Sequence, residues 1–275
     1  MKKISLALIV FAFVFQISSC GNKPAENADA PKAPKLKESD VAYSVDSTSM
    51  TGFAVYDENI EGKRPAVLVV PEWWGLNDYA KKRARMLAEL GYVAMAVDMY
   101  GNAQTADNPE AAQKLATPFY MNPVMAKSHF DAALSKLKSM GEVDTTKIAA
   151  IGYCFGGGML LNFARLGETL NGMVSFHGSL LGTPADKSLL KTKLLVLNGE
   201  ADQFVPSTEV TTFKRQMDSI GADYTFKSYA NATHAFTNPD ATANGQKFKI
   251  PIAYNAAADT ASWKEMKGFL ETVFK

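Results

Sequence analysis

The 275-residue chain has few cysteines, little net charge and no long hydrophobic run. Its 29 lysines and arginines nearly balance 28 aspartates and glutamates, and no basic cluster is interleaved with aromatic residues, so nothing supports nucleic-acid binding. Two cysteines, Cys20 and Cys154, are too few for a disulfide framework. No cluster of histidine, cysteine or aspartate has metal-ligand spacing, and we therefore expect neither a metal nor another cofactor.

The first twenty residues have the layout of a secretory signal. Two lysines, Lys2 and Lys3, precede a mostly apolar run at 4–15, which is too short to span a bilayer. The sequence ISSC, which ends at Cys20, resembles the lipobox of bacterial lipoproteins, in which the cysteine is lipidated and becomes the mature N-terminus. The alternative is a simple cleaved signal with a chance cysteine.

This resemblance divides the chain into a lipoprotein signal peptide at 1–19, a lipidated N-terminus and flexible tether at 20–39, and one folded domain at 40–275. The Ala-, Pro- and Lys-rich composition after Cys20 is typical of a tether and cannot build a core. We expect an exported protein whose lipid anchors it to a bacterial cell-envelope membrane, with the folded domain in the periplasm. With Cys20 lipidated, Cys154 would be a lone thiol.

From about residue 40 onward, strand-like and helix-like segments alternate. Continuous apolar runs, typical of parallel strands buried on both faces, lie at 66–70, 92–98, 147–152, 172–176 and 193–199. Antiparallel strands are predicted at 41–45 and 51–56, an edge strand at 222–230, helices at 77–90, 123–140 and 259–274, and a loop at 101–120. The sequence therefore predicts an α/β fold with a mostly parallel central sheet and helices on both faces.

A glycine cluster, GYCFGGG at 152–158, lies between an apolar strand-like run and an apolar helix-like run. Its spacing fits neither the dinucleotide fingerprint nor the phosphate-binding P-loop. Gly152, Cys154 and Gly156 instead fit the nucleophile elbow G-x-S-x-G, with cysteine in place of serine. Such a turn places the sulfur near a helix N-terminus, where the dipole favours a thiolate. A buried structural thiol beside packing glycines is the alternative.

Two further residues follow Cys154 in the order expected of an α/β-hydrolase, first an acid and then a histidine. Asp202 comes directly after the run at 193–199, and His234 comes after the strand at 222–230. Taken singly, Asp202 could be a helix cap or turn residue and His234 an ordinary loop histidine. Their joint order and placement favour a catalytic set with Cys154.

The segment PEWWGLN, at 71–77, is the loop after the strand at 66–70, and in this fold that loop donates the second oxyanion-hole N–H. The candidate backbone donors are therefore Trp73 and the residue after the nucleophile, Phe155. Glu72 stands before two tryptophans in an apolar stretch, which is an unusual place for a solvated carboxylate, although a turn residue facing water is the alternative.

The segments PEWWGLN, VDMYG, IGYCFGGG, NGEADQFVP, NATHAF and AAADTASWKEMKGFL resemble the dienelactone hydrolase family of α/β-hydrolases, from about residue 50 to the C-terminus. The resemblance implies the α/β-hydrolase fold and a carboxylic ester hydrolase that cleaves a small ester or lactone through a thioester intermediate. By motif match, Cys154 would be the nucleophile, His234 the general base and then acid, and Asp202 the orienting carboxylate. Glu72 would interact with the resting thiol and help to form the thiolate.

The sequence departs from this family where arginines bind the substrate carboxylate. Asn102 and Asn238 stand at the positions where arginine is expected, and an amide lacks the bidentate cationic fork that suits a carboxylate. We therefore predict a neutral or less acidic ester, lactone or thioester as substrate. The residues expected to form a partly aromatic pocket are Trp74, Tyr100, Asn102, Phe236 and Asn238.

Three other interpretations remain open at this point. The elbow could serve an acyltransferase or thioesterase, or the chain could be a tethered, non-enzymatic binding protein with a degenerate hydrolase fold. A redox thiol would need a resolving cysteine, and none is present. His177 is interpreted as a structural or supporting residue of the site, and His129 as a surface or packing residue.

Overall fold

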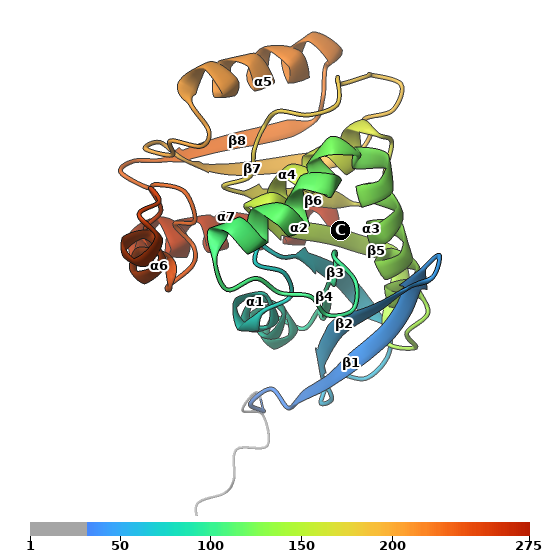
Figure 1. Ribbon diagram of the computed structural model, residues 1–275. Helices are drawn as coiled ribbons and strands as arrows, with labels where there is room; N and C mark the ends of the chain where they lie inside the picture. Colours follow the sequence, from blue (N-terminus) through green and yellow to red (C-terminus); the bar gives the residue numbers. More distant parts are fainter. Residues whose placement is uncertain (1–31) are drawn as a thin grey trace, which may run out of the picture. The chain divides into compact units, whose positions relative to one another are not determined.

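The computed structural model describes residues 32–275 (Figure 1). The predicted signal peptide, Cys20 and most of the predicted tether lie outside these residues. In the part of the chain that is described, no helix combines the length and the apolar character needed to cross a bilayer.

The described residues form an eight-stranded sheet with the strand order β1-β2-β4-β3-β5-β6-β7-β8 (Figure 1). The β1–β2 and β2–β4 pairs are antiparallel, and all other neighbouring strands are parallel. The strands are β1 (Leu36–Val45), β2 (Thr48–Asp57), β3 (Arg64–Val70), β4 (Val93–Ala96), β5 (Val143–Tyr153), β6 (Gly172–Phe176), β7 (Lys193–Gly199) and β8 (Tyr224–Tyr229). The predicted α/β-hydrolase fold, with a mostly parallel sheet, is confirmed.

Helices cover both faces of the sheet, and each face has its own apolar core. One core lies under α2, α3, α4 and α5, and the other lies under α1 and α7. The helices are α1 (Asp78–Glu89), α2 (Pro109–Met121), α3 (Pro123–Lys138), α4 (Phe155–Arg165), α5 (Ser207–Ile220), α6 (Ala241–Phe248) and α7 (Ala256–Val273).

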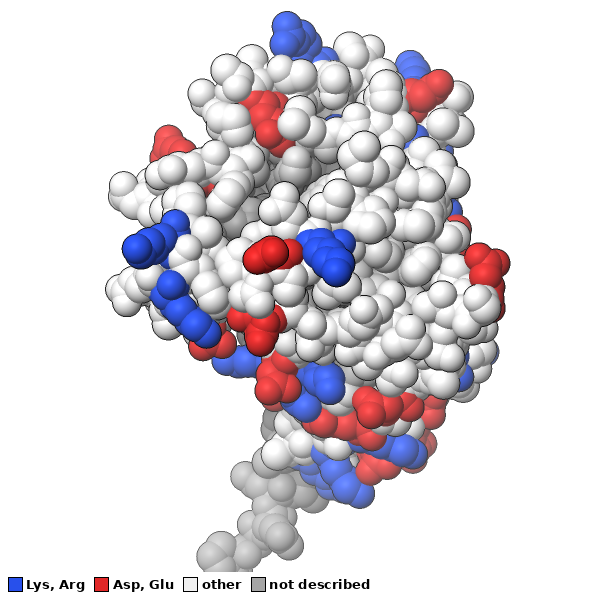
Figure 2. Space-filling model, in the orientation of Figure 1, with Lys and Arg blue, Asp and Glu red and all other residues white. Residues whose placement is uncertain are grey.

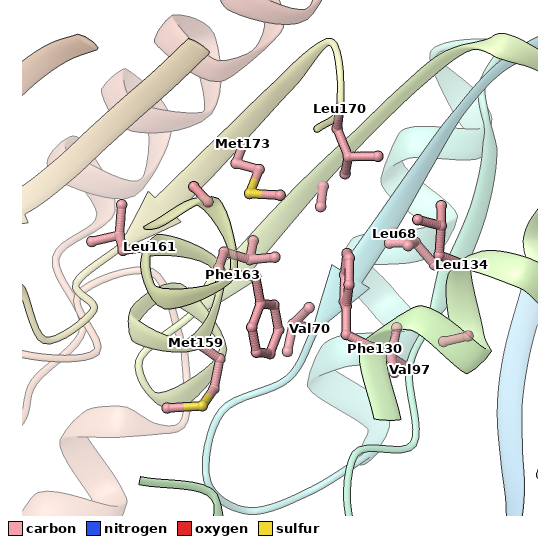
Figure 3. Close-up of a cluster of buried hydrophobic side chains, with 14 of the residues drawn as sticks. Leu68, Val70, Val97, Phe130, Leu134, Met159, Leu161, Phe163, Leu170 and Met173 are labelled. Atoms are coloured by element: carbon pink, nitrogen blue, oxygen red, sulfur yellow. The ribbon is translucent and has the colours of Figure 1, made fainter. Parts of the chain in front are cut away.

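Strand β3 illustrates why the central strands read as continuous apolar runs. Successive side chains point to opposite faces of a sheet. Leu68 and Val70 accordingly join the core beneath α3 and α4, where they lie with Phe130 and Phe163 (Figure 3), whereas Val69 joins the core beneath α1 and α7. Both faces are buried, which explains why every position from Ala66 to Val70 is apolar.

The structure corrects the prediction of a loop at 101–120, because this segment contains most of α2. Asn108 caps the helix, its side chain accepting a hydrogen bond from the Ala111 N–H at 2.9 Å, and Pro109 occupies the first turn. Ala116 and Phe119 are buried on one face of the helix. Helices α5 and α6 were also not predicted.

The boundary predicted between tether and domain, at residue 40, is four residues too late. Strand β1 begins at Leu36, which pairs with Asp57 of β2. In addition, Glu38 forms two hydrogen bonds with the Arg85 guanidinium of α1, at 2.7 and 2.9 Å. These partners are distant in sequence, so composition alone could not reveal them.

Candidate active site

Cys154 lies in a sharp turn between β5 and α4, in the elbow conformation that its glycines predicted. Its backbone has φ 51° and ψ −113°, in the region that favours glycine. A Cβ atom on Gly152 would collide with the carbonyl of Gly156, and one on Gly156 would collide with the carbonyl of Val70. The two glycines are therefore required for α4 to approach β3 and β5 closely.

The structure brings Cys154, Asp202 and His234 together at the carboxyl edge of the sheet, in loops after β5, β7 and β8. His234 Nδ1 lies 2.8 Å from Asp202 Oδ2. The other Asp202 oxygen accepts a hydrogen bond from the Phe204 N–H at 2.8 Å, which fixes the carboxylate. The Cys154 sulfur lies close enough to the His234 ring to raise the pKa of the imidazole. The three side chains are thus arranged as a nucleophile, a base and an orienting acid.

His234 is buried, yet its surroundings favour the charged ring. Burial by itself lowers the pKa of an imidazole, but the Cys154 sulfur and the Asp202 carboxylate outweigh it and raise the pKa of His234 well above its usual value. A cationic His234 in turn stabilises a thiolate beside it.

Glu72 is 2% exposed and lies in the loop after β3, at the same edge of the sheet as Cys154. Its Oε2 atom accepts a hydrogen bond from Asn238 Nδ2 at 2.7 Å, and the other end of that amide accepts one from the Asp240 N–H. Burial raises the pKa of Glu72 to about 7, against the opposing effects of the Asn238 hydrogen bond and the His234 charge. Glu72 can therefore gain or lose a proton near neutral pH.

Two backbone N–H groups are available as donors next to the sulfur. Among the described residues, neither the Trp73 N–H nor the Phe155 N–H has a hydrogen-bond acceptor. The two segments are joined by the Gly156 N–H, which donates to the Pro71 carbonyl at 3.1 Å, while the Tyr100 hydroxyl donates to the Trp73 carbonyl at 3.0 Å. This arrangement holds the two free donors in fixed positions, as an oxyanion hole requires.

A second histidine, His177, lies behind the elbow and is fully buried. Its Nδ1 atom accepts a hydrogen bond from the Cys154 N–H at 3.1 Å, so the ring proton is on Nε2, which donates to Thr237 Oγ1 at 2.7 Å. Thr237 also bonds the Tyr79 hydroxyl at 2.6 Å, and its carbonyl accepts from Arg83 at 2.6 Å. A buried network thus connects the elbow to the His234 loop and to α1.

The burial of His177, together with the positive charges of His234 and Arg83, lowers its pKa well below the usual value. A His177 ring that is neutral at physiological pH agrees with its Nδ1 atom acting as a hydrogen-bond acceptor. The interpretation of His177 as a supporting residue fits this position. His129 lies in α3, half-buried, with Nδ1 2.8 Å from the Met99 carbonyl oxygen, which is a packing role.

An apolar cavity of about 400 Å³ opens in front of Cys154. Of the predicted residues, Glu72, Trp73, Trp74 and His234 border it together with Cys154. The sequence analysis missed four other large side chains on its wall, namely Tyr120, Phe204, Ile250 and Ile252. Tyr120 falls in the segment predicted as a loop, and the isoleucines stand between α6 and α7 without any motif to mark them.

The other four residues predicted for the pocket do not border this cavity, and their placement there is corrected. The Tyr100 ring packs against the Phe155 ring, with the two ring centroids 5.6 Å apart. Asn102 is exposed in a turn, where its N–H donates to the Ser49 carbonyl at 2.6 Å.

Phe236 and Asn238 are both buried behind the wall. Phe236 packs edge-on against the His177 ring at 5.2 Å, and Asn238 is turned toward Glu72. Neither amide predicted to replace an arginine therefore faces the cavity. The prediction for Phe155 concerned only its backbone N–H, and its ring is buried.

Two properties of the site bear on its ligands. No lysine or arginine of the described residues borders the cavity. Within residues 32–275, no group of three or more histidine, cysteine or carboxylate side chains could hold a metal ion.

A sequence model of the dienelactone hydrolase family matches residues 50–274. The chain belongs to the dienelactone hydrolase family. As a member of this family it is an enzyme, a carboxylic ester hydrolase with the α/β-hydrolase fold. The family resemblance of the motifs is thereby confirmed.

Relatives of this dienelactone hydrolase family member span most of its folded domain. A putative carboxymethylenebutenolidase of Aquifex aeolicus is 29% identical over 216 residues, which are 77% of this chain and 89% of the relative. Protein usf of Aquifex pyrophilus is 32% identical over 63% of this chain and 77% of its own length. The crystal structure of a dienelactone hydrolase-like promiscuous phosphotriesterase from metagenomic libraries is 35% identical, with a TM-score of 0.82, and covers 87% of this chain and 99% of that one.

Proposed function

We propose that this dienelactone hydrolase family member cleaves a small neutral ester or lactone, with Cys154 as nucleophile, His234 as base and then acid, and Asp202 as the orienting carboxylate. The observation that carries the proposal is the position of His234, held 2.8 Å from Asp202 on one side and next to the Cys154 sulfur on the other, at the wall of an apolar cavity.

The proposed reaction has two steps. The Cys154 thiolate attacks the substrate carbonyl carbon, and the Trp73 and Phe155 N–H groups stabilise the resulting oxyanion. The C–O bond then breaks, the protonated His234 donates its proton to the leaving alkoxide, and a thioester remains on Cys154. In the second step His234 removes a proton from water, the hydroxide displaces the sulfur, and the acid product leaves with the thiolate restored.

Glu72 has a supporting role in this proposal. Its pKa of about 7 lets it hold the proton of a resting Cys154 thiol and keep it away from the sulfur as substrate arrives. The hydrogen bond from Asn238 holds the carboxyl group at the cavity wall in either protonation state.

The charge of the cavity supports a neutral substrate. No lysine or arginine of the described residues borders it, and whichever of Glu72 and Cys154 has given up the shared proton places a negative charge there. A substrate carboxylate would be repelled and would find no guanidinium to pair with. Neutral esters and lactones avoid this cost.

The test is hydrolysis of p-nitrophenyl acetate by the full-length chain in detergent. Replacing Cys154 by Ala or His234 by Gln should lower kcat/KM by about 10³-fold or more, because members of such a set act as a unit. The matched control is His129→Gln, a histidine outside the cavity, which should retain activity. Acid quenching should also trap an acetyl group on Cys154, detected by mass spectrometry of the peptide.

Full activity of the Cys154→Ala variant would refute the thioester pathway. Acyl transfer shares the first step, so the assay should be repeated with added butanol. Butyl acetate formed in preference to acetate would replace hydrolysis by the acyltransferase alternative.

We also propose that the chain is a lipoprotein anchored through Cys20 to a bacterial envelope membrane, with its active site in the periplasm. The support is the ISSC sequence after a short apolar run. Mass spectrometry of the mature N-terminus should find a diacylglyceryl cysteine, and Cys20→Ala should release the protein from the membrane fraction. An unmodified N-terminus beyond residue 20 would contradict this.

A further inference from the structure

A second hollow, of about 330 Å³, adjoins the cavity in front of Cys154. Tyr120 and Ser179 border both spaces, so the two lie next to each other. The walls of the second hollow include Pro123, at the start of α3, and Leu181, in the loop between β6 and β7. Gly158 of α4 lies between these walls and adds no side chain that would fill the space.

Tyr120 connects the hollow to the reacting sulfur. Burial of its hydroxyl end raises the pKa of the phenol, and the nearby Cys154 sulfur raises it further. At the same time 46% of the residue is exposed. The side chain thus extends from the neighbourhood of Cys154 to the protein surface, beside the second hollow.

Two of the polar side chains around the hollow, Asn162 and Ser179, already have partners within the protein. The Asn162 carbonyl oxygen accepts the Thr183 N–H at 2.8 Å, and its amide donates to the Gly158 carbonyl at 3.2 Å. The Ser179 hydroxyl donates to Glu209 at 3.1 Å. Among residues 32–275, no charged side chain borders the hollow. A ligand would therefore find few polar partners here and would gain mainly from apolar contact.

Large apolar side chains are exposed next to this hollow. Leu181 is 62% exposed, and Met121 and Val124, which flank the corner between α2 and α3, are more exposed still. Figure 2 shows few charged side chains over α2 and α3, in contrast to the lower edge of the same face. Exposed apolar side chains beside a site are one mark of a ligand-binding groove.

We propose that this groove, bordered by Tyr120, Pro123 and Leu181, binds an unbranched hydrocarbon chain of the ester substrate. The inference rests on the proposed function, which places the ester carbonyl at Cys154. From there the chain passes the Tyr120 ring and lies between Pro123 and Leu181. The preferred substrates are then medium-chain esters, and Leu181 determines chain-length specificity.

The test compares esters of different chain length on the full-length protein. Wild type, Leu181→Ser, Leu181→Met and Leu189→Ser are assayed with p-nitrophenyl acetate and octanoate, and with ethyl and octyl acetate, below their micelle concentrations. Leu189 is the matched control, because it is an exposed leucine of the same loop that does not border the hollow. The p-nitrophenyl esters carry the long chain on the acyl side of the ester bond. The alkyl acetates carry it on the alcohol side.

We expect Leu181→Ser to lower kcat/KM for the octyl or octanoyl substrate by about three- to tenfold, the effect of losing part of an apolar contact. Activity on p-nitrophenyl acetate should stay within about twofold, and Leu181→Met, which keeps an apolar side chain, should retain long-chain activity. The series that responds identifies the side of the ester that occupies the groove.

The proposed groove would be contradicted if Leu181→Ser lowered kcat/KM equally for short and long esters. An equal loss of long-chain activity in Leu189→Ser would also contradict it. So would a wild type that gains nothing from a longer chain in either series. These outcomes would leave the proposed function intact as long as acetate hydrolysis still depends on Cys154. Loss of that dependence would instead refute the proposed function itself.

Discussion

His234 and His177 lie next to each other at the carboxyl edge of the sheet, with ring centroids 5.2 Å apart, and their pKa values are shifted in opposite directions. Both are buried, so burial does not explain the difference. His234 has the Asp202 carboxylate and the Cys154 sulfur as partners, which favour its charged form. His177 accepts a backbone N–H and faces the positive charges of His234 and Arg83.

The partners of a buried histidine, rather than its depth, decide whether its ring is charged or neutral. In the proposed mechanism, the His234 ring exchanges protons with the substrate. The His177 ring is kept neutral, with a defined tautomer, and accepts a hydrogen bond from the Cys154 backbone. The role of each histidine can be tested by removing the group that distinguishes it from the other.

The largest effect should come from Asp202→Asn, which removes the carboxylate from His234. An amide can donate to Nδ1 and favour the wrong tautomer, so kcat for p-nitrophenyl acetate should fall about 10³- to 10⁴-fold. The control is Asp186→Asn, in an exposed loop away from the cavity. A loss below about tenfold would mean that Asp202 does not orient His234.

Glu72→Gln should change how stability depends on pH. The pKa of Glu72 is raised to about 7 in the folded protein, so its favourable contribution is fully present below about pH 4.5 and is lost as pH rises through 7. From acid to alkaline pH, the variant should therefore gain roughly 3 kcal/mol of unfolding free energy relative to wild type. Urea unfolding at several pH values measures this.

The exposed Glu89, at the end of α1, provides the control for that experiment. Glu89→Gln should show no comparable change relative to wild type between the same pH values. A constant difference between Glu72→Gln and wild type at every pH would contradict a raised pKa for Glu72.

His177→Leu should reduce catalysis by a smaller amount. The Cys154 N–H keeps its 2.9 Å hydrogen bond to the Phe176 carbonyl, but the link to Thr237 is lost and the elbow can move relative to His234. We expect kcat to fall about 10- to 100-fold, with KM within about twofold. Separate kcat and KM measurements check this, and His177→Gln, which keeps a donor and an acceptor, should recover part of the rate. A rise in KM at unchanged kcat would refute a positioning role.

The smallest effect concerns the titration of the two rings. In ¹⁵N-histidine NMR spectra, Cys154→Ala should move the titration midpoint of His234 downward, because the sulfur raises its pKa. His177 should stay neutral, protonated on Nε2, over the range of about pH 5 to 8. Titration of His177 within that range would remove the distinction between the two histidines.

Much of the fold and the family could be predicted from local sequence patterns. The strands at 66–70 and 172–176 appeared as apolar runs because both faces of the sheet are covered. Helix α2 was missed, since two of its three buried residues are alanines and the segment at 101–120 is rich in polar residues. The start of β1 was missed for a different reason, as its residues gain their partners from β2 and α1.

The candidate site could be predicted where a motif fixes the backbone. GYCFG determines the elbow, because side chains at Gly152 or Gly156 would collide with neighbouring backbone. The loops that carry Asp202 and His234 follow parallel strands, and these strands end at the same edge of the sheet. The pocket was predicted less well, because Tyr100, Asn102, Phe236 and Asn238 do not border the cavity.

The alternation of strands and helices, the elbow and the order of Cys154, Asp202 and His234 follow from local sequence, since these depend on periodicity and on the steric demands of a few adjacent residues. In contrast, the side chains that border the cavity and the opposite charge states of the two histidines follow from the folded arrangement. Those properties depend on burial and on partners such as Arg83 and Thr237, which are far away in the chain and meet the site only when the helices pack on the sheet.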